Sequence, residues 1–163
     1  MLKQILCVFG AFGLMLSPAM AQDAGEIAKV RDGKSCAGCN LFQADLSYQD
    51  AAKINLSGSR LRQSNMALTT YDDVNMSNAN LSLANLFGAR FNRVNLKGAN
   101  LQKAIGVGAY FGASDFTGAD LSGANFSGAD LTLSKGLTQD QLNRACGDAK
   151  TNLPKGKTIP NCS

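Results

Sequence analysis

The sequence contains no histidine and no tryptophan, and only 17% of its residues are charged. Histidine is the most common general base in enzymes and the most common metal ligand, so its absence disfavours both roles. The formal net charge is +4 and falls by one, to +3, without Lys3. A charge this small does not indicate nucleic-acid binding. The sequence therefore predicts no catalytic residues, no metal site and no cofactor.

The sequence also lacks an apolar run long enough to cross a membrane, which takes about 20 residues. Its main run, from Ile5 to Leu16, follows the positively charged Lys3 and precedes Ala19-Met20-Ala21. This order is typical of a secretory signal peptide with a cleavage site of small residues. We therefore expect residues 1–21 to be removed after Ala21. The mature chain would have no membrane span and would be periplasmic or secreted.

From residue 39 to residue 133, a large apolar residue recurs at nearly every fifth position. A small residue usually stands two positions earlier and Asn or Asp one position earlier, as in Ala79-Asn80-Leu81. An α-helix needs apolar spacings of three and four, and a half-buried strand needs two, so neither fits. A short fixed period instead indicates a solenoid whose units bury their apolar residues by stacking. The central positions are Leu41, Leu46, Ala51, Leu56, Leu61, Met66, Tyr71, Met76, Leu81, Leu86, Phe91, Leu96, Leu101, Gly106, Phe111, Phe116, Leu121, Phe126 and Leu131.

This pattern resembles the pentapeptide-repeat family, whose unit is Ala, then Asp or Asn, then Leu and two variable residues. The resemblance covers residues 39–133 and implies an all-β fold, a right-handed, four-sided β-helix with one pentapeptide per side. The central residue and the small residue two positions before it would point inward. Residues 20 apart support four units per coil, because one such column is Leu throughout: Leu41, Leu61, Leu81, Leu101 and Leu121.

A short helix is expected in residues 22–38, because the open apolar end of a solenoid must be covered. Asp23 can cap this helix together with Glu26, and the helix would run to about Asp32. The segment from Cys36 to Cys39 then leads into the first repeat.

A second capping helix is expected in residues 134–163. Thr138 and Gln141 form a capping box, and Gly147 is expected to end the helix. The rest of the chain would be a loop closed by Cys162.

The mature chain has an even number of cysteines, which in an exported protein indicates disulfides. A disulfide needs Cα atoms within about 7 Å. Because the pairs would lie at opposite ends of the solenoid, we predict Cys146–Cys162 and Cys36–Cys39, and no zinc site built from all four. A redox role for Cys36 and Cys39 is an alternative. Thiol-disulfide enzymes, however, usually place this motif at the start of a helix.

One side differs from the others, which mostly carry Asn or Asp before the central residue. It comprises residues 49–53, 69–73, 89–93, 109–113 and 129–133. Arg90 should lie beneath Tyr110 in a cation–π contact, and Lys53, Asp73 and Arg93 should alternate in charge along it. The candidate binding residues are Lys53, Tyr71, Asp73, Arg90, Arg93 and Tyr110. Other outward aromatic residues, namely Phe42, Tyr48 and Phe87, are interpreted as scattered over the remaining sides.

Two irregularities interrupt the repeat. Between Gln49 and Asp73 several units depart from the pattern, so local fraying or a small bulge is expected. Gly106 puts no side chain into its layer, and Phe126, one coil further, is expected to lean into the gap.

The leading functional prediction is an exported, non-catalytic structural or protein-binding module whose partner is an unknown protein of the cell envelope. We expect a monomer that binds no nucleic acid. Two alternatives remain. Some pentapeptide-repeat proteins imitate DNA and bind gyrase, but they are strongly acidic, unlike this chain. The other alternative is a periplasmic thiol-disulfide protein that uses Cys36 and Cys39.

Overall fold

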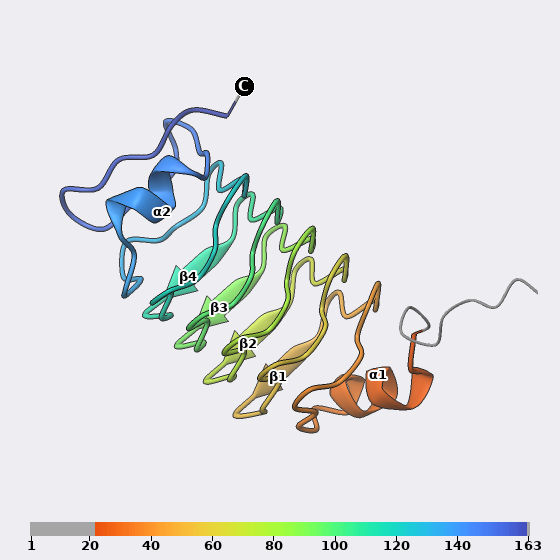
Figure 1. Ribbon diagram of the computed structural model, residues 1–163. Coiled ribbons are helices and arrows are strands. Elements are labelled where there is room, and N and C mark those ends of the chain that lie inside the picture. Colours follow the sequence, from red (N-terminus) through yellow and green to blue (C-terminus); the bar gives the residue numbers. More distant parts are fainter. Residues whose placement is uncertain (1–21, 163) are drawn as a thin grey trace, which may run out of the picture.

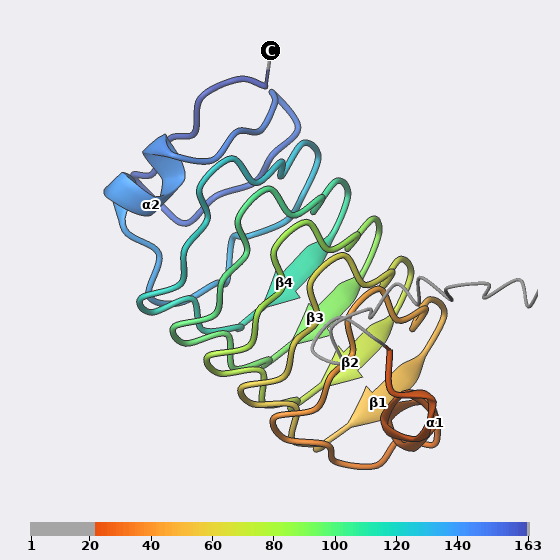
Figure 2. The same cartoon turned by 45° about the vertical axis from the view of Figure 1, so that its right-hand side comes forward.

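The computed structural model describes residues 22–162, with a helix at each end of a solenoid (Figures 1 and 2). The expected leader, residues 1–21, and its cleavage site lie outside the described residues. Within residues 22–162, no helix is long and apolar enough to cross a membrane. The elements in order are α1 (Ala24–Arg31), β1 (Asp50–Ala52), β2 (Thr70–Asp72), β3 (Arg90–Asn92), β4 (Tyr110–Gly112) and α2 (Gln139–Asn143).

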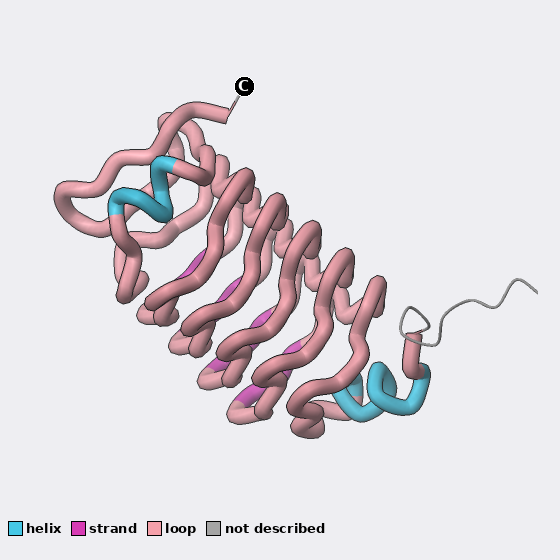
Figure 3. The backbone as a smooth tube through the Cα atoms, in the orientation of Figure 1, coloured by secondary structure: helices cyan, strands magenta, loops and turns pink. Residues whose placement is uncertain are grey.

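The strands form one parallel sheet in the order β1-β2-β3-β4 (Figure 3). Isolated bridges connect the rest of each coil. Paired strand residues are 20 apart, as in Ala51 and Tyr71. The bridges between the repeats have the same offset, as in Asn80 and Asn100. One coil therefore takes 20 residues, which confirms the predicted four pentapeptides per coil.

The coils stack their pentapeptides into four sides. Side 1 is centred on Leu41 and on each twentieth residue after it. Side 2 comprises residues 44–48, 64–68, 84–88, 104–108 and 124–128. Side 3 comprises residues 49–53, 69–73, 89–93, 109–113 and 129–133, and contains β1 to β4. Side 4 is centred on Leu56 and on each twentieth residue after it.

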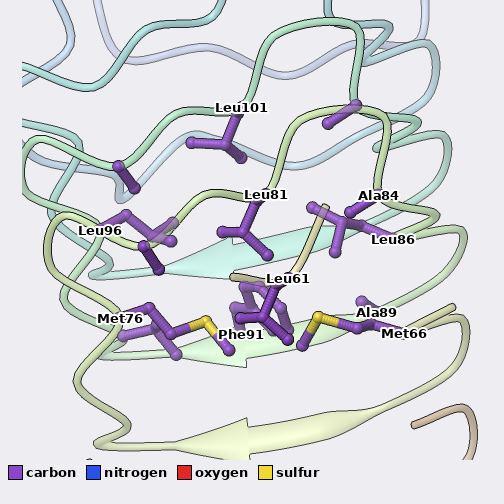
Figure 4. Close-up of a cluster of buried hydrophobic side chains, with 14 of the residues drawn as sticks. Leu61, Met66, Met76, Leu81, Ala84, Leu86, Ala89, Phe91, Leu96 and Leu101 are labelled. Carbon is purple, nitrogen blue, oxygen red and sulfur yellow. The ribbon is translucent and has the colours of Figure 1, made fainter. Parts of the chain in front are cut away.

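The central residues and the small residues before them fill the interior of the solenoid (Figure 4). Leu61, Leu81 and Leu101 are fully buried in one column. On side 2, a Cβ atom added to Gly106 would lie 2.7 Å from Cδ1 of Phe126. The Phe126 ring therefore occupies the space that Gly106 leaves, which confirms that prediction.

The segment 49–73, expected to fray or bulge, is regular. β1 and β2 pair residue for residue, with Ala51 opposite Tyr71. Thr69 is buried at an inward position, where its Oγ1 donates to the carbonyl of Met66 at 3.0 Å. The inward polar side chain is accommodated because it forms a hydrogen bond within its own corner.

Helix α1 covers the N-terminal end through both polar and apolar contacts. Asp23 caps it by accepting N–H groups of the first turn. The carboxylate of Glu26 does not bond back to Asp23 but accepts the backbone N–H of Asn40 at 2.5 Å. Glu26 thus supplies an acceptor to the first coil, which has no coil beneath it. Ile27 and Val30 are buried on the same helix.

Helix α2 has the predicted capping box. Thr138 Oγ1 accepts the N–H of Gln141 at 3.2 Å, and Gln141 Oε1 accepts the N–H of Thr138 at 2.8 Å. The helix ends at Asn143, so the prediction that Gly147 ends it is wrong. Gly147 instead forms a parallel bridge with Asn161 in the C-terminal tail.

Parallel pairing continues beyond Leu133, where the five-residue period ends. The offsets grow from 20 to 21 and 22 residues, so the C-terminal region adds an irregular partial coil. Parallel pairing thus extends past the predicted end of the repeats into the C-terminal cap. The bridges are Asp115↔Lys135, Asn125↔Cys146 and Asp130↔Asn152.

Candidate functional site

On side 3, Arg90 and Tyr110 form the contact that the sequence predicted. The Cζ atom of Arg90 lies 4.8 Å from the centroid of the Tyr110 ring, one coil further along. The ring also covers Gly112, because a Cβ atom added there would collide with it. The cation–π contact is therefore confirmed, and Gly112 leaves room for the ring to lie against the wall.

Asp73 and Arg93 form a bidentate ion pair on the same side. Nε of Arg93 lies 2.7 Å from Oδ1 of Asp73, and Nη2 lies 2.9 Å from Oδ2. Hydrogen bonding from Arg93 lowers the pKa of Asp73, and the charges of Arg93 and Lys53 lower it further. The same hydrogen bonds raise the pKa of Arg93. Asp73 and Arg93 are thus paired with each other, while Lys53 acts on Asp73 through its charge alone.

Tyr71 is wrongly included among the candidate binding residues, because its side chain is fully buried. It stands at a central position, and its ring stacks on Phe91 with centroids 5.7 Å apart and an interplanar angle of 7°. Its hydroxyl group has no hydrogen-bond partner within the described chain. Burial raises the pKa of Tyr71. Side 3 is left with Lys53, Asp73, Arg90, Arg93 and Tyr110.

The Cys36 and Cys39 sulfur atoms are 1.90 Å apart, with Cα atoms 5.5 Å apart. Both residues are buried, and a carboxylate oxygen of Glu26 lies within 4.8 Å of both sulfur atoms. These three residues could bind a metal ion only after reduction, since a disulfide sulfur is not a thiolate ligand. A neighbouring carboxylate also disfavours a thiolate. The geometry fits a structural crosslink better than a redox centre.

The Cys146 and Cys162 sulfur atoms are 1.98 Å apart, with Cα atoms 4.8 Å apart. Backbone hydrogen bonds fix both residues: Cys146 donates to the carbonyl of Ala124, and Cys162 donates to that of Gly147, each at 2.9 Å. This pair therefore joins the end of the tail to the last coils.

The interpretation of Phe42, Tyr48 and Phe87 as scattered is wrong for two of them. Tyr48 and Phe87 both lie on side 2, where they are 74% and 50% exposed. Stacking the outward positions of residues 20 apart reveals this grouping, as stacking the inward positions reveals the core. Three further exposed apolar residues lie on or beside side 2: Leu68, Leu83 and Ile105.

The stacked coils, filled interior and paired wall residues define a class of protein, the non-helical solenoid built from five-residue units. The family model described as pentapeptide repeats (8 copies) matches residues 39–69, 72–102 and 95–132. These matches cover more than half of the chain, so the protein belongs to the pentapeptide-repeat family.

Several solved pentapeptide-repeat structures are similar to this chain. Rfr23 from the cyanobacterium Cyanothece 51142 is 23% identical, with 79% of this chain and 97% of that chain covered and a TM-score of 0.46. A thylakoid-lumen pentapeptide-repeat protein of Arabidopsis thaliana is 33% identical, with 57% of this chain and 68% of that chain covered and a TM-score of 0.26. QnrB1, a plasmid-mediated fluoroquinolone resistance protein, is 17% identical, with 69% of this chain and 74% of that chain covered and a TM-score of 0.38. A comparison with curated protein sequences finds no match.

Proposed function

We propose that the mature chain is an exported, non-catalytic pentapeptide-repeat module that binds a protein partner in the cell envelope. The supporting observation is how the walls use their polar groups. Arg93 is bound to Asp73, and Nδ2 of Asn85 donates to Oδ1 of Asn65 at 3.1 Å. Groups engaged in this way stabilise the solenoid, whereas catalytic groups converge on a reacting atom.

Export is supported by two independent features. Residues 1–21 have the composition of a secretory leader. The two cysteine pairs, Cys36 with Cys39 and Cys146 with Cys162, have the short sulfur separations of disulfides. Disulfides persist mainly in exported proteins, because the cytosol keeps thiols reduced.

The two alternative functions have less support. A DNA-mimicking gyrase binder needs an acidic surface, whereas this chain has 16 Lys and Arg against 12 Asp and Glu. A thiol-disulfide enzyme needs an accessible, stabilised thiolate. Cys36 and Cys39 are instead buried beside the carboxylate of Glu26.

The proposal can be tested by expressing the chain with its leader and measuring the intact mass of the periplasmic protein. Free thiols are blocked with one alkylating reagent before reduction, and newly released thiols with a second reagent afterwards. We expect a chain without residues 1–21 in which all four cysteines carry only the second label.

A double variant, Cys36→Ser with Cys39→Ser, serves as the control. It should still be exported, with the Cys146–Cys162 pair protected from the first label. An uncleaved cytoplasmic product with free thiols would overturn the export proposal and favour the two alternatives.

A further inference from the structure

Side 2 carries an exposed apolar stripe. Among the described residues, five of the six exposed large hydrophobic residues lie on this side or at its border with side 1. The sixth, Leu133, lies on side 3. The stripe consists of Tyr48 (74% exposed), Leu68 (44%), Leu83 (38%), Phe87 (50%) and Ile105 (46%).

Backbone hydrogen bonds place the stripe residues on adjacent coils. The N–H of Leu68 donates to the carbonyl of Phe87 at 2.9 Å. The N–H of Ile105 donates at 2.9 Å to the carbonyl of Ala84, which directly follows Leu83. The Leu68 side chain also leans over the next coil, because a Cβ atom on Gly88 would lie 2.7 Å from its Cδ2. The stripe is therefore one continuous surface.

The requirements of the fold do not explain these residues. Asn85 donates to Asn65, and Asn65 to Asp45, in a side-chain ladder that Ile105 interrupts. The corner geometry does not require leucine either. Leu68 and Leu83 adopt the left-handed conformation that favours glycine, with φ of 57° and 60°, and other corners hold it with polar residues such as Gln63 and Asn78. A surface that departs from the preferences of its own fold is a candidate for function.

Charge distinguishes this surface from the other three sides. From the second coil onward, side 2 contains no Lys, Arg, Asp or Glu. From the second coil onward, basic residues border the stripe at Arg62, Lys103 and Arg90, and none of these forms a salt bridge within residues 22–162. In the first coil, Asp45 and Asp50 lie beside Tyr48, so the basic border belongs to the later coils. Contiguous apolar surface with a polar rim is characteristic of protein interfaces.

The area of side 2 disfavours a second copy of this chain as the occupant. Four coils about 4.8 Å apart and a five-residue side no wider than about 17 Å give less than about 350 Å² per copy. Two such faces bury well under the roughly 1,200 Å² of a stable interface, an area that fits a transient contact with a partner rather than a lasting dimer. Two copies in antiparallel contact would also bring their basic borders together.

From this surface and its basic border we propose that side 2 binds an amphipathic helix of a partner protein, whose apolar face is bordered by Asp and Glu. A helix laid along the solenoid presents apolar residues about every 5.4 Å, close to the coil spacing of about 4.8 Å. Its acidic borders would then face Arg62, Lys103 and Arg90. This inference rests on the proposed protein-binding function and specifies the surface and the partner's chemistry.

The test uses the mature, oxidised protein and two synthetic helical peptides of about 18 residues, long enough to span the stripe. Both peptides carry the same Leu face, bordered by Glu in one and by Lys in the other. Fluorescence anisotropy should show that the Glu peptide binds at least about tenfold more tightly and that added salt weakens its binding.

Variants locate the contact. Leu68→Ser with Phe87→Ser should weaken binding of the Glu peptide about tenfold or more, because exposed apolar anchors dominate such interfaces. Leu133→Ser, the matched control on side 3, should bind as the unaltered protein does. Circular dichroism and thermal unfolding establish that each variant is folded.

Equal affinity for both peptides, or full affinity in the Leu68→Ser/Phe87→Ser protein, would overturn the inference. Two further outcomes would also overturn it. One is tight binding to vesicles of one part phosphatidylglycerol and three parts phosphatidylcholine that is lost in the same variant. The other is self-association that is lost in the same variant. Peptide binding by a chain that proves cytoplasmic would refute export alone, so the two proposals fail separately.

Discussion

At every fifth residue from Gln43 to Gly128, the last residue of the pentapeptide turns the chain between sides in the left-handed backbone region. Gly118 does so at φ 69°, and Ala113, at the same position of the preceding pentapeptide, does so at φ 53°. A Cβ atom in this conformation costs about 1–2 kcal/mol, while glycine loses about 0.5–1 kcal/mol through its larger unfolded-state entropy. Each non-glycine corner therefore retains a small strain, which neighbouring coils must offset.

Replacing Ala113 with Gly should raise the free energy of unfolding by about 0.5–1 kcal/mol, because it removes this strain. Gly118→Ala is the matched control and should lower it by a similar amount. Its added Cβ would approach nothing closer than the Gly98 nitrogen at 4.0 Å, so only the backbone conformation is tested. Urea unfolding measures both changes. Shifts in the same direction would contradict the backbone explanation.

Tyr71→Phe should stabilise the protein by about 1 kcal/mol or more, because it removes a buried hydroxyl group without a hydrogen-bond partner. The effect should grow in alkali. Burial raises the pKa of Tyr71 in the folded state, so above the unfolded pKa of about 10 the unfolded state ionises first. The free energy of unfolding of the unaltered protein is therefore unaffected by Tyr71 ionisation below about pH 10 and falls as pH rises above it. Between pH 8 and pH 11, the free energy of unfolding should fall less in Tyr71→Phe than in the unaltered protein. An unchanged pH dependence would be inconsistent with this assignment.

Among the elements, the helices could be predicted because their signals are local. Asp23 caps α1, and Thr138 with Gln141 caps α2, through side chains within three residues in sequence. The irregular coil beyond Leu133 could not be predicted, because it is held by backbone pairing that leaves no five-residue pattern. The bond from Glu26 to Asn40 is equally invisible in sequence, since it joins residues that meet only after folding.

Gln141 shows how α2 replaces a missing coil. In the regular coils the carbonyl of Ala99 accepts the N–H of Asp120, one coil further. The equivalent carbonyl of Ala119 has no such donor and instead accepts Nε2 of Gln141 at 2.8 Å. The same Nε2 donates to the carbonyl of Phe116 at 2.9 Å. Gln141 is buried and fully engaged, so its side chain completes the last coil.

Gln141→Ala should lower the free energy of unfolding by about 2–3 kcal/mol, because it leaves the buried carbonyl of Ala119 without a donor and removes the capping box. The carbonyl of Phe116 would lose one of its two donors and keep the N–H of Ala119. Asp140→Asn, on an exposed position of the same helix, should change it by less than about 0.5 kcal/mol. Chemical denaturation compares the two. Equal effects would mean that Gln141 contributes no more than a surface residue.

For the whole molecule, the five-residue period predicted the interior, whereas the four units per coil came from the family resemblance together with the columns of residues 20 apart. Function is harder, because most positions report on the solenoid. Tyr71 was misplaced when a central position was treated as part of a face. The apolar stripe was missed because Tyr48 and Phe87 are 39 residues apart in sequence and come to lie on the same side, two coils apart, only when the coils are stacked. Its residues are recognisable as unusual once the preference of each outward position is known.

At the N-terminal end of the solenoid, one edge of the sheet is left uncovered. The N–H of Thr70 donates to the carbonyl of Gln49, and the N–H of Lys53 donates to the carbonyl of Asp72. Gln49 and Lys53 flank β1, so along this segment every second residue turns its backbone groups toward β2. Asp50 and Ala52 therefore direct their N–H and C=O groups toward the uncovered edge of the sheet. Helix α1 supplies partners to other parts of the first coil but leaves this edge open. The charge of Asp50 is a common protection against edge pairing.

Val30→Asp should release α1 and make the solenoid associate through its N-terminal end. Val30 is 1% exposed, and a carboxylate there would be buried without a partner, so the docked helix would lose its main apolar contact. Light scattering coupled to gel filtration should show a monomer for the unaltered mature chain and concentration-dependent larger species for the variant. Lys29→Asp, on the exposed face of α1, should stay monomeric. If the Val30→Asp protein has released α1 and is still monomeric, Asp50 alone protects the edge. The double variant Val30→Asp/Asp50→Ala should then associate.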